Sequence, residues 1–237
     1  MDNLNIKFHD TLNQNIWEGE TLKKEVKETL DRVAEEFIKF LKIDVKPLDI
    51  RIVGSSANYN YTDQSDIDLH ILVDFSKIKG EDTFVKEYFD AKKYIWNTEH
   101  DIMIYGHEIE CYVQGVGEKN VSAAIYSLKN SNWVKKPKKE THKIDTSAVR
   151  YKAKDFAEQI ELAKGDLESL TGLKDKLKKM RRSGLDTVGE YSVENLVFKV
   201  LRNSGKIKKM LDYAKNIFDK ELSLKELHES EWIDLVN

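Results

Sequence analysis

Cysteine and proline are scarce in this sequence, and both shortages limit what the chain can be. There is one cysteine, Cys111, so no disulfide can form within the chain, which is typical of proteins in a reducing compartment. The two prolines, Pro47 and Pro137, lie between candidate elements, where a helix breaker is tolerated. We therefore expect uninterrupted elements between these positions and a cytoplasmic location.

The sequence also lacks a long apolar run and a large excess of charge. No apolar stretch reaches the roughly 20 residues that cross a bilayer, and the first residues, MDNLNIKFHD, contain no apolar segment of the signal-peptide kind. The formal net charge is −3, which argues against a protein that coats nucleic acid. We therefore expect no membrane partner.

The chain does contain regular apolar patterns under a heavy load of charge. Of its 237 residues, 40% are hydrophobic and 34% are charged, which predicts a buried core beneath a strongly charged surface. This length suits one large domain or two modest ones.

Helical and strand patterns alternate over the first 140 residues. Helices are predicted at 17–42 and 81–96, because apolar residues recur there at helical spacing. Strands are predicted at 48–54, 66–75, 101–105 and 107–114, with a further hairpin around the turn at 129–132. Residues 1–140 are therefore expected to form an α/β (α+β) domain, a mixed sheet of four to five strands with flanking helices.

The strand patterns stop after Pro137. One helix is predicted from Val149 to Leu170 and another from Ser192 to Phe218, both from apolar residues at helical spacing. Residues 141–237 are therefore expected to form a second, all-helical domain.

Two carboxylates lie at the start of an apolar strand in the stretch IVGSSANYNYTDQSDIDLHILVDF, residues 52–75. Side chains alternate along a strand, so Asp66 and Asp68 point to one face and Ile67 to the other. Adjacent carboxylates repel each other unless a cation lies between them. Mg²⁺ suits such a place, because it is usually held by one or two carboxylates together with substrate phosphates.

Gly54 and Ser55 follow the preceding strand and predict a phosphate-binding loop. Glycine lets the backbone approach a ligand closely, and free amide groups at the following turn can bind an anion. The serine hydroxyl adds another donor. One end of the stretch can therefore hold phosphate while the other holds a metal ion.

A third carboxylate is available in the strand HEIECYVQ, residues 107–114. Glu108 and Glu110 alternate with apolar residues and share one face. We prefer Glu110, which lies in the body of the strand between Ile109 and Cys111. Glu108, nearer the turn at Gly106, is the second choice.

These residues together resemble the signature of the polymerase-β-like nucleotidyltransferase superfamily. The signature is a Gly-Ser pair, a loop, two acidic residues that flank an apolar one, and a third acidic residue in a later strand. The resemblance covers about residues 50–114 and is carried by the phrase GSSANYNYTDQSDIDL.

The resemblance implies transfer of a nucleoside monophosphate from a triphosphate such as ATP to an acceptor hydroxyl, with release of pyrophosphate. The metal would be Mg²⁺ or Mn²⁺, and Glu110 would help to deprotonate the attacking hydroxyl. The catalytic and metal-binding residues implied are Asp66, Asp68 and Glu110. The nucleotide-binding residues implied are Gly54, Ser55, Ser56 and Ser65.

Several alternatives remain open at this point. The acceptor could be an RNA end, a protein, a small molecule or a second nucleotide. The chain could instead be an inactive binding or regulatory protein of the same fold, for example in a toxin–antitoxin-like pair. Structural roles are favoured for Cys111, His70 and His107, and a solvated surface is favoured over phosphate binding for the lysine clusters at 135–139 and 176–182.

Overall fold

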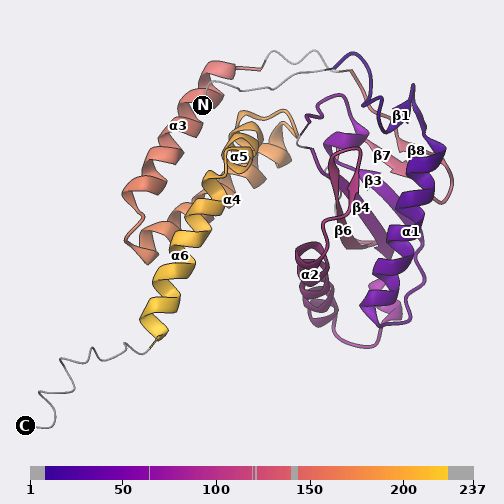
Figure 1. Ribbon diagram of the computed structural model, residues 1–237, viewed down its shortest axis with the longest axis horizontal. Helices are drawn as coiled ribbons and strands as arrows, with labels where there is room; N and C mark the ends of the chain where they lie inside the picture. The colour runs from indigo at the N-terminus through magenta and orange to yellow at the C-terminus, as the bar shows by residue number, and fades with distance from the viewer. Residues whose placement is uncertain (1–8, 64, 119, 121, 140–143, 224–237) are drawn as a thin grey trace, which may run out of the picture. The chain divides into compact units, whose positions relative to one another are not determined.

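The computed structural model describes residues 9–63, 65–118, 120, 122–139 and 144–223. The chain divides into two compact units, one within Asn5–Lys143 and the other within Ile144–Asn237. The first unit mixes strands and helices, and the described part of the second is helical (Figure 1). The predicted fold class, a mixed α/β sheet followed by helices, is confirmed.

The first unit is built on a sheet of six strands, one more than the upper end of the prediction. Their order across the sheet is β5-β6-β4-β3-β7-β8. The neighbours β4 and β6 are parallel, and the other neighbouring strands are antiparallel. The strands are β3 (Asp49–Val53), β4 (Ile67–Val73), β5 (Met103–Ile104), β6 (His107–Gly115), β7 (Ile125–Ser127) and β8 (Asn132–Lys135).

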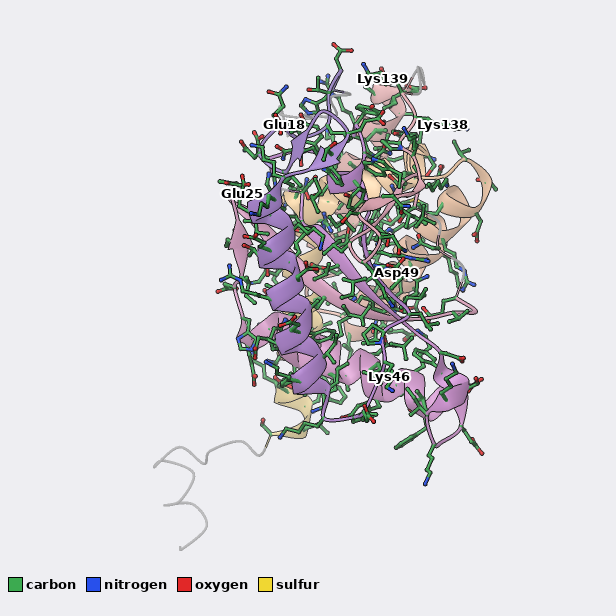
Figure 2. All side chains as sticks on the ribbon, turned by 90° about the vertical axis from the view of Figure 1, so that its right-hand side faces the viewer. Glu18, Glu25, Lys46, Asp49, Lys138 and Lys139 are labelled. Carbon is green, nitrogen blue, oxygen red and sulfur yellow. The ribbon has the colours of Figure 1, made fainter. Side chains whose placement is uncertain are left out.

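Two helices pack against this sheet. Helix α1 (Lys24–Leu41) precedes β3, and helix α2 (Asp82–Glu99) provides the crossover that two parallel strands require between β4 and β6. The two helices meet where the ring of Phe37 lies 5.4 Å from that of Trp96. Figure 2 shows Glu25 at the start of α1 and Asp49 where β3 begins.

The alternation along β4 separates the core from the polar face of the sheet. Ile67, Leu69 and Ile71 are fully buried in one hydrophobic core with α1 and α2. Asp68 and His70 lie on the opposite face and are half-buried. The sheet therefore presents its acidic residues on the face that the core does not use.

The prediction of a helix from residue 17 is wrong for its first seven residues. Trp17–Glu18 (β1) and Thr21–Leu22 (β2) form a small hairpin instead, and Gly19 adopts a φ of 60°, which suits a turn and interrupts a helix. Trp17 is buried, stacks on Trp133 and donates a hydrogen bond to the carbonyl of Ser56. The hairpin therefore supports the loop that follows β3.

The outer edge of β6 is closed by a side chain rather than by a strand. β5 pairs only with His107 and Glu108. At Cys111, the side-chain amide of Asn97 accepts a hydrogen bond from the backbone N–H at 3.0 Å and donates one to the carbonyl at 3.1 Å. Asn97 thus takes the place of a strand neighbour, which leaves fewer unpaired groups on an exposed edge.

The second unit contains α3 (Thr146–Leu162), α4 (Leu167–Thr187), α5 (Val193–Asn203) and α6 (Lys206–Leu222). The predicted helix at 149–170 is wrong in its continuity, because the chain turns after Ala163 and Asp166 caps the amides of Glu168 and Ser169. The predicted helix at 192–218 is likewise interrupted at Gly205, whose φ is 71°. Among the described helices, none is long and apolar enough to span a membrane.

Part of the lysine cluster at 176–182 holds the second unit together. Lys176 bonds to Gln159 and lies over the ring of Phe156. Arg181 bonds to Asn195 and lies 4.1 Å from the ring centre of Phe198. These two cations therefore have intramolecular roles, in addition to the solvated surface that the sequence predicts for the cluster.

We predict that Asn97→Ala destabilises the first unit by about 1–3 kcal/mol, because a donor and an acceptor of the Cys111 backbone lose their partner. Thr98→Ala is the matched control, since Thr98 is exposed and bonds only to its own helix. Urea unfolding followed by tryptophan fluorescence reports mainly on this unit, which holds Trp17, Trp96 and Trp133. Equal midpoints for the two variants would contradict the role assigned to Asn97.

Candidate active site

Asp68 and Glu110 are direct neighbours across the parallel strands β4 and β6. The register of β4 and β6 pairs Asp68 with Glu110, and it pairs Ile67 with Ile109. Neighbouring strands lie about 4.8 Å apart, so the two carboxylates start from adjacent backbone positions on the same face. By the same register, Glu108 is level with Asp66, the residue just before β4.

The charges of these acidic residues affect one another. The pKa of Glu108 is raised, first by partial burial and then by the negative charges of Asp66, Glu110 and Asp101. Within the described residues, no three acidic, histidine or cysteine side chains converge closely enough to hold a metal ion as they stand. Carboxylates that repel one another are expected to stay apart until a cation joins them, and their oxygens are the donors that Mg²⁺ prefers.

Gly54 makes room for the carboxylate of Asp68. Its φ is 74° and its ψ is −157°, a conformation that essentially only glycine adopts. A Cβ atom placed on Gly54 would lie 2.1 Å from Oδ2 of Asp68. The backbone of the loop and the carboxylate are therefore in direct contact. The predicted approach of a phosphate to this glycine stays a prediction.

The serines of the loop bond to one another and to the backbone near Asp66. Ser55 donates to the hydroxyl of Ser65 at 3.0 Å, and that hydroxyl also accepts from the N–H of Thr62. Ser56 is buried and donates to the carbonyl of Asp66. These bonds join the two ends of the loop, so the segment after Gly54 fixes the backbone where Asp66 begins.

His107 joins the same loop to the start of β6. Its Nδ1 donates to the carbonyl of Ser65 at 2.7 Å, and its Nε2 accepts from the side-chain amide of Asn13 at 2.8 Å. A carbonyl can only accept, so the Nδ1–H tautomer follows from this pairing. All three residues are buried, and the predicted structural role of His107 agrees with this arrangement.

A cavity of about 180 Å³ opens beside Asp68 and Glu110. Its other lining residues are His70, Lys93, Cys111 and Tyr112. His70 bonds through Nδ1 to Gln114 at 3.0 Å, and burial lowers the pKa of its imidazole. Burial raises the pKa of the Cys111 thiol to about 12, which disfavours the thiolate and therefore a nucleophilic role.

Sequence patterns identified the acidic residues and the glycine but missed the residues around them. The structure brings Asp68 and Glu110 together and places Gly54 against Asp68. Asn13, Lys93 and Tyr112 were missed, because each belongs to an element with an ordinary helical, loop or strand pattern. Tyr112 could have been located only by aligning the two strands that flank the α2 crossover, because that alignment places it opposite His70.

We predict that Gly54→Ala lowers both stability and any activity, because its Cβ and Oδ2 of Asp68 would overlap. Gly19→Ala is the control for a positive φ, since nothing lies within 4 Å of a Cβ there. The double variant Gly54→Ala, Asp68→Ala should recover part of the loss in unfolding free energy. A Gly54→Ala cost no larger than that of Gly19→Ala would show that the close contact is unimportant.

Comparison with known proteins agrees with this geometry. Residues 34–123 match the model of the nucleotidyltransferase domain family. The matched segment runs from α1 through β6 and includes the loop at Gly54, both aspartates and Glu110. Comparisons with curated proteins and with solved structures gave no match.

The match and the arrangement of the strands point to one family. Its model covers the central strands β3, β4 and β6 and the α2 crossover between the parallel pair. Residues 34–123 of this chain therefore form a nucleotidyltransferase domain of the polymerase-β-like superfamily.

Proposed function

We propose that the protein is a metal-dependent nucleotidyltransferase. It moves a nucleoside monophosphate from a nucleoside triphosphate, such as ATP, to an acceptor hydroxyl and releases pyrophosphate. Residues 1–140 form the catalytic domain, and residues 141–237 form a second domain, which is helical in the part that the structure describes. A cytoplasmic location fits the single buried cysteine.

The observation that carries this proposal is the pairing of Asp68 with Glu110 beside Gly54. Two acidic residues on adjacent strands of one face gain no structural benefit from each other, since like charges repel. The backbone at residue 54 accommodates one of these carboxylates only as glycine, because a Cβ atom there would overlap it. Repulsion of this kind is found at functional sites, and a cation with an anionic substrate would offset it.

Asp66, Asp68 and Glu110 are the residues that would hold Mg²⁺ or Mn²⁺. When bound, a divalent ion of this kind neutralises triphosphate charge and stabilises the attacking and leaving oxygens. Glu108, level with Asp66 in the register, lies one pleat away from Glu110 and stays the second choice for the third carboxylate.

The loop after β3 is assigned to the triphosphate. Gly54 lets the backbone approach the phosphates closely, and Ser55, half-buried, offers its hydroxyl. A contact between the nucleotide and Ser56 or Ser65 stays a prediction. The hydroxyls of these two residues already hold the loop against Asp66 and Thr62, so we assign them the additional role of fixing the loop.

Glu110 receives the proton in the transfer step. The oxygen of the acceptor hydroxyl forms a bond to the α-phosphorus, and the bond from that phosphorus to the pyrophosphate oxygen breaks. The hydroxyl proton passes to the carboxylate of Glu110, and pyrophosphate leaves with the bonding electron pair. Positioning and charge neutralisation supply most of the acceleration in reactions of this type.

A direct test incubates the protein with each labelled triphosphate and Mg²⁺, with and without total RNA and cell lysate. Appearance of label in an acceptor together with released pyrophosphate would support the proposal. Binding of a triphosphate without any turnover would instead favour the inactive regulatory relative, which keeps the fold and the nucleotide site.

We predict that Asp68→Asn lowers the transfer rate by about a hundredfold or more, because a ligand worth several kcal/mol of charge stabilisation is lost. Without metal, the variant should melt at the same temperature as the wild type or slightly higher, since a repulsion is relieved. Asp101→Asn removes an exposed carboxylate near Glu108 and serves as control. If Asp68→Asn unfolds, Asp68 is structural; if it stays active, the metal lies elsewhere.

We also predict different losses for the two glutamates of β6. Glu110→Gln should slow transfer by about 10²–10⁴-fold, the usual contribution of a general base, whereas Glu108→Gln should slow it little. Both rates are measured at saturating nucleotide and metal. The opposite order would assign the third carboxylate to Glu108, and equal small losses would argue for a site made of aspartates alone.

A further inference from the structure

The triphosphate loop and Lys93 lie on opposite sides of Asp68. β3, which leads into Gly54, is the neighbour of β4 on one side, and β6 is its neighbour on the other. Tyr112 belongs to β6, and Lys93 to α2, which packs on β6. The cavity at Asp68 and Glu110 extends toward this second side, because Lys93 and Tyr112 line it. This side of the cavity, with His70, Lys93 and Tyr112, is the lysine wall.

Lys93 carries the positive charge that remains unmatched on this wall. Lys86 is paired with Glu118 at 3.0 Å, and Arg51 is paired with Asp49 at 2.8 Å. Lys93 instead lies over the ring of Tyr112, 4.9 Å from its centre, and has no carboxylate within 4 Å among the residues that the structure describes. Its ammonium group is thus held at the cavity and remains able to bind an anion.

His70 adds one hydrogen-bonding atom to the same wall. Gln114 accepts at Oε1 from Asn120 and from His70 Nδ1, and its amide nitrogen donates to the carbonyl of Glu118. This orientation of the amide assigns the hydrogen to Nδ1 of His70. A ligand in the cavity can therefore bond to this ring only through Nε2.

In-line transfer then determines which reactant lies on this side. The attacking and leaving oxygens take opposite sides of the reacting phosphorus. With the triphosphate tail at Gly54 and Ser55, on the β3 side, the attacking hydroxyl approaches from the side of β6. The wall that carries Lys93 and His70 is therefore next to the acceptor.

We propose that this wall is the acceptor subsite and that the acceptor carries a phosphate group, bound by Lys93, next to its reactive sugar hydroxyl. This rests on the proposed transferase function and narrows it to one chemical class. Nucleotides and oligonucleotides with a free 3′-hydroxyl have this chemistry, whereas a protein hydroxyl and an uncharged small molecule do not. Nε2 of His70 accepts a hydrogen bond from a sugar hydroxyl of the same acceptor.

Lys93→Gln tests the subsite, with Lys92→Gln as its matched control. Lys92 is the preceding residue of the same helix, and its ammonium lies over Phe40 and Tyr88, outside the cavity lining. Lys93→Arg keeps the charge. Thermal melts of all three variants check that each is folded.

Binding is measured by calorimetry with Mg²⁺ and a saturating non-hydrolysable triphosphate, so that the triphosphate site is filled. The probes are the four nucleoside monophosphates, a short oligoribonucleotide with a free 3′-hydroxyl, and adenosine. We expect monophosphate or oligonucleotide to bind about tenfold or more weakly to Lys93→Gln, the value of one charge-assisted contact. Wild type, Lys92→Gln and Lys93→Arg should bind alike, and adenosine should not distinguish the variants.

Three results would overturn the subsite. The first is that no phosphorylated probe binds the wild type, the second is an equal loss in Lys92→Gln and Lys93→Gln, and the third is a loss of triphosphate affinity in Lys93→Gln instead. Failure of the proposed function looks different, because triphosphate would then not bind with Mg²⁺ or would release no pyrophosphate. If Lys93→Gln weakens binding of a nucleoside monophosphate, the acceptor is a mononucleotide. If it weakens binding of the oligoribonucleotide instead, the acceptor is a nucleic-acid end.

Discussion

The contact between Gly54 and the carboxylate of Asp68 is the constraint on which the rest of the site depends. A side chain at residue 54 would overlap Oδ2 of Asp68. The loop can therefore lie this close to β4 only if residue 54 is glycine. The close approach in turn allows Ser56 to reach the backbone of Asp66 and Ser55 to reach Ser65. Two further hydrogen bonds hold the loop, one from Trp17 to the carbonyl of Ser56 and one from His107 to the carbonyl of Ser65. The side chain of Asn13 in turn donates to His107. One close backbone contact is thus stabilised by several buried hydrogen bonds.

The parallel pairing of β4 and β6 brings the third carboxylate to this contact. Because the strands are parallel and in register, residues on one face of β4 meet their counterparts on β6 at the same level, so Asp68 faces Glu110 and His70 faces Tyr112. The crossover helix α2 makes this pairing possible and also closes the free edge of β6 through Asn97. The same helix carries Lys93 to the cavity. A single βαβ unit therefore carries Asp68, Glu110 and Lys93, the residues to which we assign metal binding, proton transfer and acceptor binding.

Much of the fold was predictable, because strands and long amphipathic helices have strong periodic signals. The alternation of Ile67, Leu69 and Ile71 with polar residues located β4, and the preference for Glu110 is consistent with its register opposite Asp68, although its role stays a prediction. Periodicity failed where breaks are local: the apolar pattern continues through residues 17–23 and through Gly205, but the positive φ of Gly19 and Gly205 interrupts the helix there. Pairwise contacts such as Asn13 with His107 span 94 residues, and a single sequence gives no signal for them.

The two sides of Asp68 differ in the kind of charge that they offer, and the proposed reaction places one reactant on each side. Near β3, neutral donors and a backbone without a side chain can accommodate a triphosphate whose charge is neutralised by metal at the aspartates. Near α2, the charge is a lysine held over an aromatic ring, and a metal ion is not needed to bind an anion there. A single phosphate therefore suits the lysine wall, whereas a triphosphate needs the metal ligands as well. In the proposed reaction, donor and acceptor would thus be distinguished by the number of negative charges that each side can neutralise.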